Sequence, residues 1–266
     1  MTSPPFPKLW NEQRKPHLFC PGCGHPIVLK GLALALEKLD LGKKTVVGFD
    51  IGCALLAWDF LKVDSFQTHH GRTVPTMVGL KMARPEILAI AYEGDGGAYA
   101  IGLQSLVMAA WRNDPIVTIV VNNSVYAMTG GQMAPTTLCG EVTDSTPSGK
   151  ECEPQEKRAF FGPEFLSAVC AQNAYLARTS IRHLGPLQQI LEKAITNTLR
   201  NNAFSFVEVI SVCPTNWKTD AAGTLQMLEK MEQTFPIKEI KLPQTHKTPN
   251  PQVNPKTLSS LTTKQK

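Results

Sequence analysis

Two short polar motifs follow apolar runs of the sequence, and their side chains could bind a metal ion and a phosphate group. Gly94-Asp95-Gly96 follows the run 87–92, and Asn122-Asn123 follows the run 116–121. A carboxylate and an amide oxygen are hard ligands that suit Mg²⁺, which also binds phosphate oxygens. Glycines let the backbone approach a phosphate closely. One helix and one strand fit between the motifs, so we expect both motifs at the carboxyl edge of a parallel sheet.

This pairing is the pattern of the thiamine diphosphate motif, in which Mg²⁺ anchors the diphosphate of the cofactor. The competing interpretation is a Gly-Asp-Gly turn and an Asn-Asn turn that coincide by chance, because each half alone is a weak signal. A dinucleotide-binding fingerprint fits less well, since the run from Gly94 to Tyr99 lacks the third glycine.

A pair of cysteines near the N-terminus forms a second candidate site, in Cys20-Pro21-Gly22-Cys23-Gly24-His25. Such a pair occurs in zinc sites, iron–sulfur sites and thioredoxin-type redox sites. The redox motif needs a strand just before it, and we expect none in residues 1–19. Zinc would require a second compact pair, and the remaining cysteines are scattered.

Cys53 and Cys213 each follow a predicted strand, and with the first pair they make the four thiolates that an iron–sulfur cluster requires. The alternative is that both are reduced cysteines of the core. Cys139, Cys152 and Cys170 are interpreted as non-ligands. We expect the seven cysteines to be free, catalytic or metal-binding rather than disulfide-bonded.

His70 lies in the run Thr68-His69-His70-Gly71-Arg72, a glycine-containing loop before a predicted helix. A histidine there could contact a cofactor or a substrate oxyanion. The alternative is a solvated loop histidine, which is common.

Continuous runs of apolar and β-branched residues alternate with helical patterns, which favours an α/β fold with a mostly parallel sheet and helices on both faces. Strands are expected at 45–49, 87–92, 116–121 and 204–210, and helices at 27–39, 98–111, 165–177 and 187–199. Residues 132–162 lack periodicity and indicate a long functional loop.

Three regions follow from composition: an extended N-terminal arm at 1–19, one domain at 20–235, and a tail at 236–266 that is disordered or bound to a partner. The tail holds six lysines and one glutamate, which account for the whole net charge of +5. The near-neutral body gives no support to nucleic-acid binding. We also find no apolar run of the roughly 18 residues that span a membrane, and we expect a cytoplasmic protein.

Together these motifs resemble the beta subunits of 2-oxoacid:ferredoxin oxidoreductases. Cys-Pro-Gly-Cys-Gly-His, Ile-Gly-Cys, His-Gly-Arg, Gly-Asp-Gly, Asn-Asn-x-x-Tyr-x-Met-Thr-Gly-Gly-Gln and Cys-Pro-Thr occur in the order seen in that family, from Phe19 to about Trp217. The run from Asn122 to Thr137 is highly specific.

The resemblance implies a role for each matching residue. Mg²⁺ would be bound by Asp95, Asn123 and the carbonyl of Val125; the thiamine diphosphate would be contacted by Ile51, Gly52, Cys53, Ala54, His70, Gly96, Gly97, Ala127 and Met128; and a [4Fe–4S] cluster would be held by Cys20, Cys23, Cys53 and Cys213. His70 is the candidate catalytic residue. Position 54 is Ala where the family commonly has a small hydroxyl residue, which puts one polar contact to the diphosphate in doubt.

The implied reaction is the oxidative decarboxylation of a 2-oxo acid. Carbon dioxide leaves, coenzyme A takes the acyl group, and two electrons pass singly through the cluster to ferredoxin. The expected partners are an alpha subunit and gamma or delta subunits, and the glutamate that activates the cofactor is expected on another subunit of the complex. The run Met128 to Thr137 is most like enzymes for branched-chain substrates such as 2-oxoisovalerate, with pyruvate, 2-oxoglutarate and indolepyruvate left open.

Two other functions compete with this one. A non-redox thiamine diphosphate decarboxylase or synthase subunit would need no cluster. A cysteine-ligated electron-transfer or scaffold subunit would bind no thiamine diphosphate.

Overall fold

A computed structural model of the chain describes residues 6–14, 16–153 and 158–243. Within these residues, seven strands form one sheet in the order β2-β1-β3-β4-β8-β7-β9, and only β9 runs antiparallel to its neighbour. The strands are β1 (Thr45–Phe49), β2 (Asp64–Gln67), β3 (Leu88–Gly94), β4 (Val117–Asn122), β7 (Tyr175–Ser180), β8 (Ser205–Ile210) and β9 (Lys238–Lys241). The prediction of an α/β fold with a mostly parallel sheet is confirmed.

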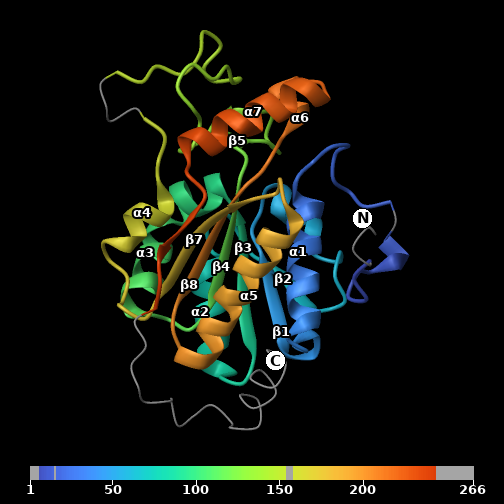
Figure 1. The fold of residues 1–266 in the computed structure, drawn as a ribbon, viewed down its shortest axis with the longest axis vertical. Helices are drawn as coiled ribbons and strands as arrows, with labels where there is room; N and C mark the ends of the chain where they lie inside the picture. The colour runs from blue at the N-terminus through green and yellow to red at the C-terminus, as the bar shows by residue number, and fades with distance from the viewer. Residues whose placement is uncertain (1–5, 15, 154–157, 244–266) are drawn as a thin grey trace.

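Helices cover both faces of the sheet (Figure 1). On one face α1 (His25–Lys38) packs against α5 (Leu184–Asn201), and on the other α2 (Thr73–Ala83) packs against α3 (Leu103–Arg112). The central strands are therefore buried on both sides, which is why they read as continuous apolar runs. The other elements are α4 (Gly162–Ser167), α6 (Pro214–Trp217), α7 (Ala221–Thr234), β5 (Val125–Tyr126) and β6 (Gln132–Met133).

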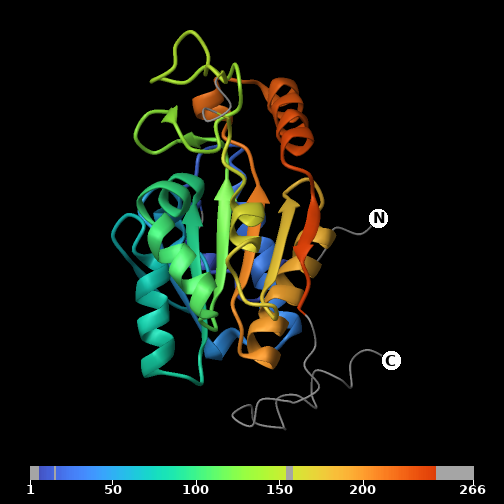
Figure 2. The ribbon, with the colours of Figure 1, turned by 90° about the vertical axis from the view of Figure 1, so that its left-hand side faces the viewer.

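Four neighbouring strands bring the predicted site residues to one edge of the sheet. β1, β3, β4 and β8 are adjacent and parallel, so the segments that follow them emerge side by side. Figure 2 shows these segments above the carboxyl ends of the strands. β2 and β3 pair with opposite sides of β1, which makes the gap between β1 and β3 a topological switch point. Open α/β sheets bind ligands at such points.

One predicted helix is wrong. Residues 165–177 were expected to be helical, but α4 ends at Ser167 and β7 begins at Tyr175. The run Tyr-Leu-Ala-Arg-Thr-Ser contains good helix formers and an arginine, which favours an exposed helix over a central strand. In the fold Arg178 is fully buried, because carboxylates of other elements bind it.

Both predicted terminal segments are partly integrated into the domain. Lys238–Lys241 form β9 rather than part of a tail, so the domain boundary at residue 235 is wrong; residues 244–266 lie outside the described chain. In the N-terminal segment Trp10 is buried, forms a β-bridge with Leu61, and packs its ring 4.0 Å from that of Phe60. The expected arm is therefore packed on its own chain where it is described.

The cysteine prediction needs one correction. Cys139 and Cys152 form a disulfide with their Cα atoms 5.5 Å apart, whereas all seven cysteines were expected to be unpaired. The other five are free. The disulfide lies within the long loop predicted at 132–162. Among the described residues of this loop, β6 is the one strand before α4 begins at Gly162. None of the described helices is both long and apolar enough to cross a membrane.

Candidate functional site

Twelve residues predicted from the sequence line a single cleft of about 120 Å³ at the carboxyl edge of the sheet. They come from the segments after β1, β3 and β4 and from the loop before α2. They are Ile51, Gly52, Cys53, Ala54, His70, Asp95, Gly96, Gly97, Asn123, Val125, Ala127 and Met128. The structure thus brings together every predicted cofactor and magnesium residue, from four separate parts of the chain.

Asp95 is the buried acid of the cleft. It follows β3 directly, and its Oδ2 accepts a hydrogen bond from the hydroxyl of Thr136. Burial raises the pKa of the Asp95 carboxyl to about 7. A cation bound in the cleft would favour the ionised form and offset that desolvation. The carboxyl group is therefore suited to bind a divalent metal ion that has lost part of its hydration shell.

The second half of the motif is a tight turn after β4. Ser124 has a positive φ of 60°, which turns the chain so that Asn123 and Val125 both face the cleft. The Oδ1 atom of Asn123 accepts a hydrogen bond from the backbone N–H of Val125 at 3.3 Å. The side-chain amide of Asn123 and the backbone carbonyl of Val125 both provide oxygen atoms, and Asn123 is buried. This donor set of carboxylate, amide and carbonyl oxygens fits Mg²⁺.

The two glycines after Asp95 have no room for a side chain. A β-carbon at Gly96 would lie 2.1 Å from Cε1 of Tyr126, and one at Gly97 would lie 1.9 Å from Oδ2 of Asp50. Their backbone therefore forms a bare, closely packed surface at the cleft. Such a surface lets the peptide groups approach a diphosphate, as the motif requires.

The segments after β1 and before α2 form the other wall. Gly52 has a φ of 122°, a conformation that favours glycine, and the next residue, Cys53, begins a short 3₁₀-helix. His70 lines the cleft but is otherwise exposed. The following residue, Gly71, donates its N–H to Asp50 at 2.8 Å, which ties this loop to the end of β1.

Four free cysteines lie near one another beside the cleft. The Cys20–Cys23 turn packs on the segment after β8, where Gly24 donates to the carbonyl of Val212 at 3.4 Å. Burial, with smaller contributions from the charges of Cys213 and Cys20, raises the pKa of Cys23 to about 11. Burial likewise raises the pKa of Cys53 to about 12, with contributions from the other three thiols.

This grouping fits an iron–sulfur cluster better than a single ion. Within the described residues, no group of three or more His, Cys, Asp or Glu side chains is placed to hold one metal ion. In a four-iron cluster each thiolate binds a different iron, so the ligands lie farther apart than those of one ion. The four thiols repel one another as anions, and the iron ions of a cluster would offset that repulsion. Cys170 is buried among apolar residues of the opposite face, as expected for a non-ligand.

Five lining residues were absent from the predicted site: His25, Gly94, Ile101, Tyr126 and Thr129. Nδ1 of buried His25 lies 2.9 Å from the hydroxyl of Tyr92, and burial lowers the pKa of His25 to about 4, so the ring is neutral. His25 belongs to the cysteine motif, and its spacing from Cys23 was the available signal. Tyr126 also borders a larger hollow of about 1080 Å³ between the disulfide loop and α4.

Residues 50–209 match the thiamine pyrophosphate enzyme family, in its C-terminal TPP binding domain. The chain belongs to this family. The match includes the loop from Asp50, the Asp95 and Asn123 motifs and most of β8, so every lining residue of the cleft except His25 falls within it. The chain also belongs to the family of 2-oxoacid oxidoreductase subunits, to which its curated relatives belong.

Several curated relatives are similar over most of the chain. The ketoisovalerate oxidoreductase subunit VorA of Methanothermobacter thermautotrophicus is 34% identical over 84% of this chain and 47% of its own length. The 2-oxoglutarate synthase subunit KorB of Methanothermobacter marburgensis is 36% identical over 86% of this chain and 78% of its own length. The chain thus spans about half the length of the VorA subunits that it matches.

A solved structure has the same fold. The 2-oxoglutarate:ferredoxin oxidoreductase from Magnetococcus marinus, with 2-oxoglutarate, coenzyme A and succinyl-CoA bound, aligns with a TM-score of 0.74. The alignment covers 91% of this chain and 87% of that chain at 21% identity. At this identity the likeness concerns the fold.

Proposed function

We propose that this chain is the thiamine diphosphate-binding subunit of a 2-oxoacid:ferredoxin oxidoreductase. The observation that carries the proposal is the position of Cys53. Cys53 lines the cofactor cleft, and the charges of Cys20, Cys23 and Cys213 all act on its thiol. A single residue therefore joins a cofactor site to a group of free thiols, which is the arrangement that electron transfer between them needs.

In this proposal Asp95, Asn123 and the carbonyl of Val125 bind Mg²⁺. Gly96 and Gly97 present their backbone to the diphosphate. Ile51, Gly52, Cys53, Ala54, His70, Ala127 and Met128 contact the cofactor, with His70 at the rim in reach of the substrate. The apolar side chain at position 54 is buried, so it offers packing and no hydrogen bond to the diphosphate.

Cys20, Cys23, Cys53 and Cys213 hold a [4Fe–4S] cluster. Asn216 supports the last of these, because its Nδ2 donates to Sγ of Cys213 at 3.4 Å and so favours the thiolate. A cysteine thiol must lose its proton to bind iron. The high pKa values of Cys23 and Cys53 therefore imply that metal binding releases protons.

The proposed reaction is the oxidative decarboxylation of a 2-oxo acid to an acyl-CoA, with ferredoxin as electron acceptor. Thiamine diphosphate supplies carbanion stabilisation when bound, and the protein orients it and tunes its electronics. The residues of this chain anchor the diphosphate, exclude water from the buried part of the cleft, and keep neutral His25 against its inner wall.

We infer a branched-chain 2-oxo acid, such as 2-oxoisovalerate, as the substrate. The run Met128 to Thr137 supports this, as does the similarity to ketoisovalerate oxidoreductase subunits. The similarity to 2-oxoglutarate synthase subunits favours the alternative, 2-oxoglutarate. Turnover of a panel of 2-oxo acids by the assembled complex, including pyruvate and indolepyruvate, separates these substrates.

A partner subunit is part of the proposal. Two apolar side chains at the rim of the cleft are exposed, Ile101 by 52% and Met128 by 44%. Trp111, farther along α3, is exposed by 63%. Exposed apolar side chains beside a functional cleft are typical of a surface that another subunit covers.

The test is to purify the complex without oxygen and measure its iron, its thiamine diphosphate and its visible spectrum. We expect near four irons per chain, bound thiamine diphosphate, and a broad absorption band that bleaches with dithionite. The matched variants are Cys53→Ser and Cys170→Ser, which change one free cysteine each. Only Cys53→Ser should lose the band.

The competing functions give different results in the same experiment. Bound thiamine diphosphate without iron would support a non-redox decarboxylase or synthase subunit. Iron without thiamine diphosphate would support an electron-transfer or scaffold subunit. Asp95→Ala tests the magnesium site directly, since loss of a charged ligand should abolish binding of thiamine diphosphate in calorimetry.

A further inference from the structure

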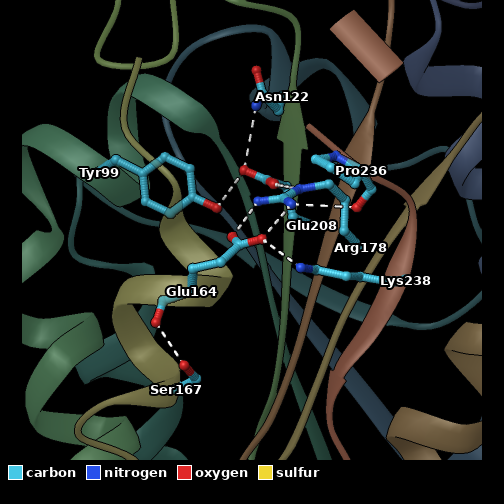
Figure 3. A network of polar contacts seen from close by, with 8 residues as sticks. All are labelled: Tyr99, Asn122, Glu164, Ser167, Arg178, Glu208, Pro236 and Lys238. Carbon is cyan, nitrogen blue, oxygen red and sulfur yellow. Dashed lines mark hydrogen bonds and ion pairs between the residues drawn. The ribbon is translucent and has the colours of Figure 1, made fainter. Parts of the chain in front are cut away.

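A buried carboxylate, Glu208, lies in the middle of the sheet, in contact with Tyr99, Asn122 and Arg178 (Figure 3). It belongs to β8, where it pairs in register with Val120 of β4 and with Arg178 of β7. Its Oε1 atom accepts two hydrogen bonds, from the hydroxyl of Tyr99 at 2.7 Å and from Nδ2 of Asn122 at 3.3 Å.

Those two donors come from the two halves of the magnesium and diphosphate motif. Tyr99 lies in the π-helical turn Gly97–Ile101, directly after the glycines that face the diphosphate. Asn122 is the last residue of β4, directly before Asn123. One oxygen atom therefore holds both halves at a fixed separation, and it belongs to a residue that does not line the cleft.

The hydrogen bond to Asn122 also sets the shape of the turn after β4. An asparagine amide has its donors on one side and its acceptor on the other. Because Nδ2 of Asn122 is bound to Glu208, its Oδ1 is directed to the backbone N–H of Ser124, at 3.1 Å. That N–H belongs to the turn that presents Asn123 and Val125 to the cleft.

Arg178 pairs with the carboxylate of Glu208 and holds it in place. Its Nε donates to Oε2 of Glu208, and its two terminal nitrogens donate to Glu164 at 2.8 and 2.6 Å. The rings of Phe161 and Phe235 lie 5.8 and 5.4 Å from the guanidinium. A guanidinium that is paired on two sides and enclosed by aromatic rings has little freedom to move.

We propose that Glu208 is a positioning residue for the magnesium and diphosphate site, acting through Tyr99 on Gly96 and Gly97 and through Asn122 on Asn123 and Val125. The inference rests on the proposed binding of Mg²⁺ and thiamine diphosphate. It adds a residue outside the motif, 86 positions after Asn122 in sequence, whose hydrogen bonds align the two halves.

The main test variant is Tyr99→Phe, because it removes one hydroxyl and keeps the ring that packs on Phe160 and Phe206. The matched control is Tyr175→Phe. Tyr175 is also buried and donates to a carboxylate, Glu239 at 2.9 Å, but at the far side of the sheet. Both variants lose a tyrosine–glutamate hydrogen bond, so both should lower the unfolding temperature. Glu208→Gln serves as a third variant if it folds.

Thiamine diphosphate and Mg²⁺ are titrated into the assembled complex by calorimetry, and turnover is measured against Mg²⁺ concentration. For Tyr99→Phe we expect about tenfold weaker cofactor binding, equal to about 1.4 kcal/mol, and a matching rise in half-saturating Mg²⁺. Turnover at saturating Mg²⁺ should stay unchanged, which a general loss of folded protein would not produce. Tyr175→Phe should bind like the wild type.

The outcomes separate two failures. Equal cofactor affinity in Tyr99→Phe and wild type, or an equal loss in Tyr175→Phe, would overturn the positioning role of Glu208. Absence of Mg²⁺-dependent thiamine diphosphate binding in the wild type would overturn the proposed function instead.

Discussion

Oδ2 of Asp50 lies 1.9 Å from the position that a β-carbon of Gly97 would occupy. Asp50 is fully buried, and its other oxygen accepts hydrogen bonds from Gly71 at 2.8 Å and Thr73 at 3.3 Å. Oδ2 has no hydrogen-bond partner within the described chain. The carboxylate thus fills the space behind the glycine turn and ties that turn to the loop that carries His70.

Gly97→Ala should therefore disturb the diphosphate wall of the cleft. The new methyl group can fit only if Asp50 or the turn moves, since the contact is far below normal van der Waals distance. We expect at least about tenfold weaker binding of thiamine diphosphate in calorimetry, or about 1.4 kcal/mol. The control is Gly79→Ala at an exposed position of α2, where a β-carbon meets nothing within 4 Å. That change should stabilise the helix by up to about 1 kcal/mol and leave binding intact; unchanged binding in Gly97→Ala would contradict the packing argument.

Asp50 should also make the apo protein sensitive to pH. Burial raises its pKa from 3.8 to about 6, although hydrogen bonds and the charge of His70 act in the opposite direction. The folded state keeps a proton that the unfolded state releases, so stability falls as pH rises from about 4 to 6 and then stays low. Burial and the charge of Asp50 raise the pKa of Glu93 to about 8, so Glu93 extends this fall in stability toward pH 8. Asp50→Asn should gain on the order of 2–3 kcal/mol over wild type at pH 8.

The measurement is thermal unfolding of both proteins without metal or cofactor, at pH 3.5 and pH 8, values chosen on either side of the window. At the acidic end Asp50 is protonated in both states, so the variant should lose its advantage. A constant difference at both pH values would show that Asp50 is ionised in the folded protein.

The sequence predicted the edge of the sheet that carries the site because its signals are local. Strand ends, glycines and hard oxygen ligands are adjacent along the chain at Asp95 and Asn123, and a parallel sheet brings such ends together without further information. Glu208 was missed for the opposite reason. Its role depends on Tyr99, Asn122 and Arg178, which meet it only through the order of the strands.

The errors have the same origin. The prediction of a helix across Tyr175 failed because this residue begins β7, which contains the buried Arg178. A buried arginine is tolerated only with a partner, and the partners of Arg178 lie on β8 and α4. Lys238–Lys241 include three charged residues and have a tail-like composition, yet they add an edge strand to β7. Edge strands tolerate lysine because one side faces solvent. The disulfide joins residues whose approach depends on the path of a loop without periodicity.

Loss of the disulfide should destabilise the loop that reaches Asp95. Cys139 and Cys152 are 13 residues apart in sequence, and the bridge follows closely on Thr136, which donates to Asp95. Closing a loop of about 15 residues contributes about 3 kcal/mol in the chain-entropy description. The double variant Cys139→Ser, Cys152→Ser should show faster hydrogen exchange at 134–150 and a lower unfolding temperature. Treating wild type with a dithiol reductant should reproduce this effect, and the same treatment of the double variant should add nothing.

Replacing cysteines one at a time should separate ligands from bystanders. Cys213→Ser should lose or strongly degrade the cluster, because Cys213 is one of four thiols whose charges act on one another. Cys170→Ser should keep near four irons per chain. Iron analysis and electron paramagnetic resonance of the reduced protein are the measurements. An intact signal in Cys213→Ser would mean that another residue is the fourth cluster ligand. The disulfide of Cys152 with Cys139 argues against Cys152 as that ligand.

The isolated chain should be inactive after reconstitution with iron, sulfide, Mg²⁺ and thiamine diphosphate. Among the described residues that line the cleft, Asp95 is the only carboxylic acid, and the proposed magnesium site uses it. No second acid is therefore placed to activate the aminopyrimidine ring, and such general acid–base help typically contributes about 10²–10⁴-fold. The assay is 2-oxo acid-dependent reduction of a viologen dye, with the co-purified complex as the positive control and cofactor binding as proof that the isolated chain is folded. Full turnover by the chain alone would require a catalytic acid within these 266 residues and would remove the main reason for a partner at this cleft.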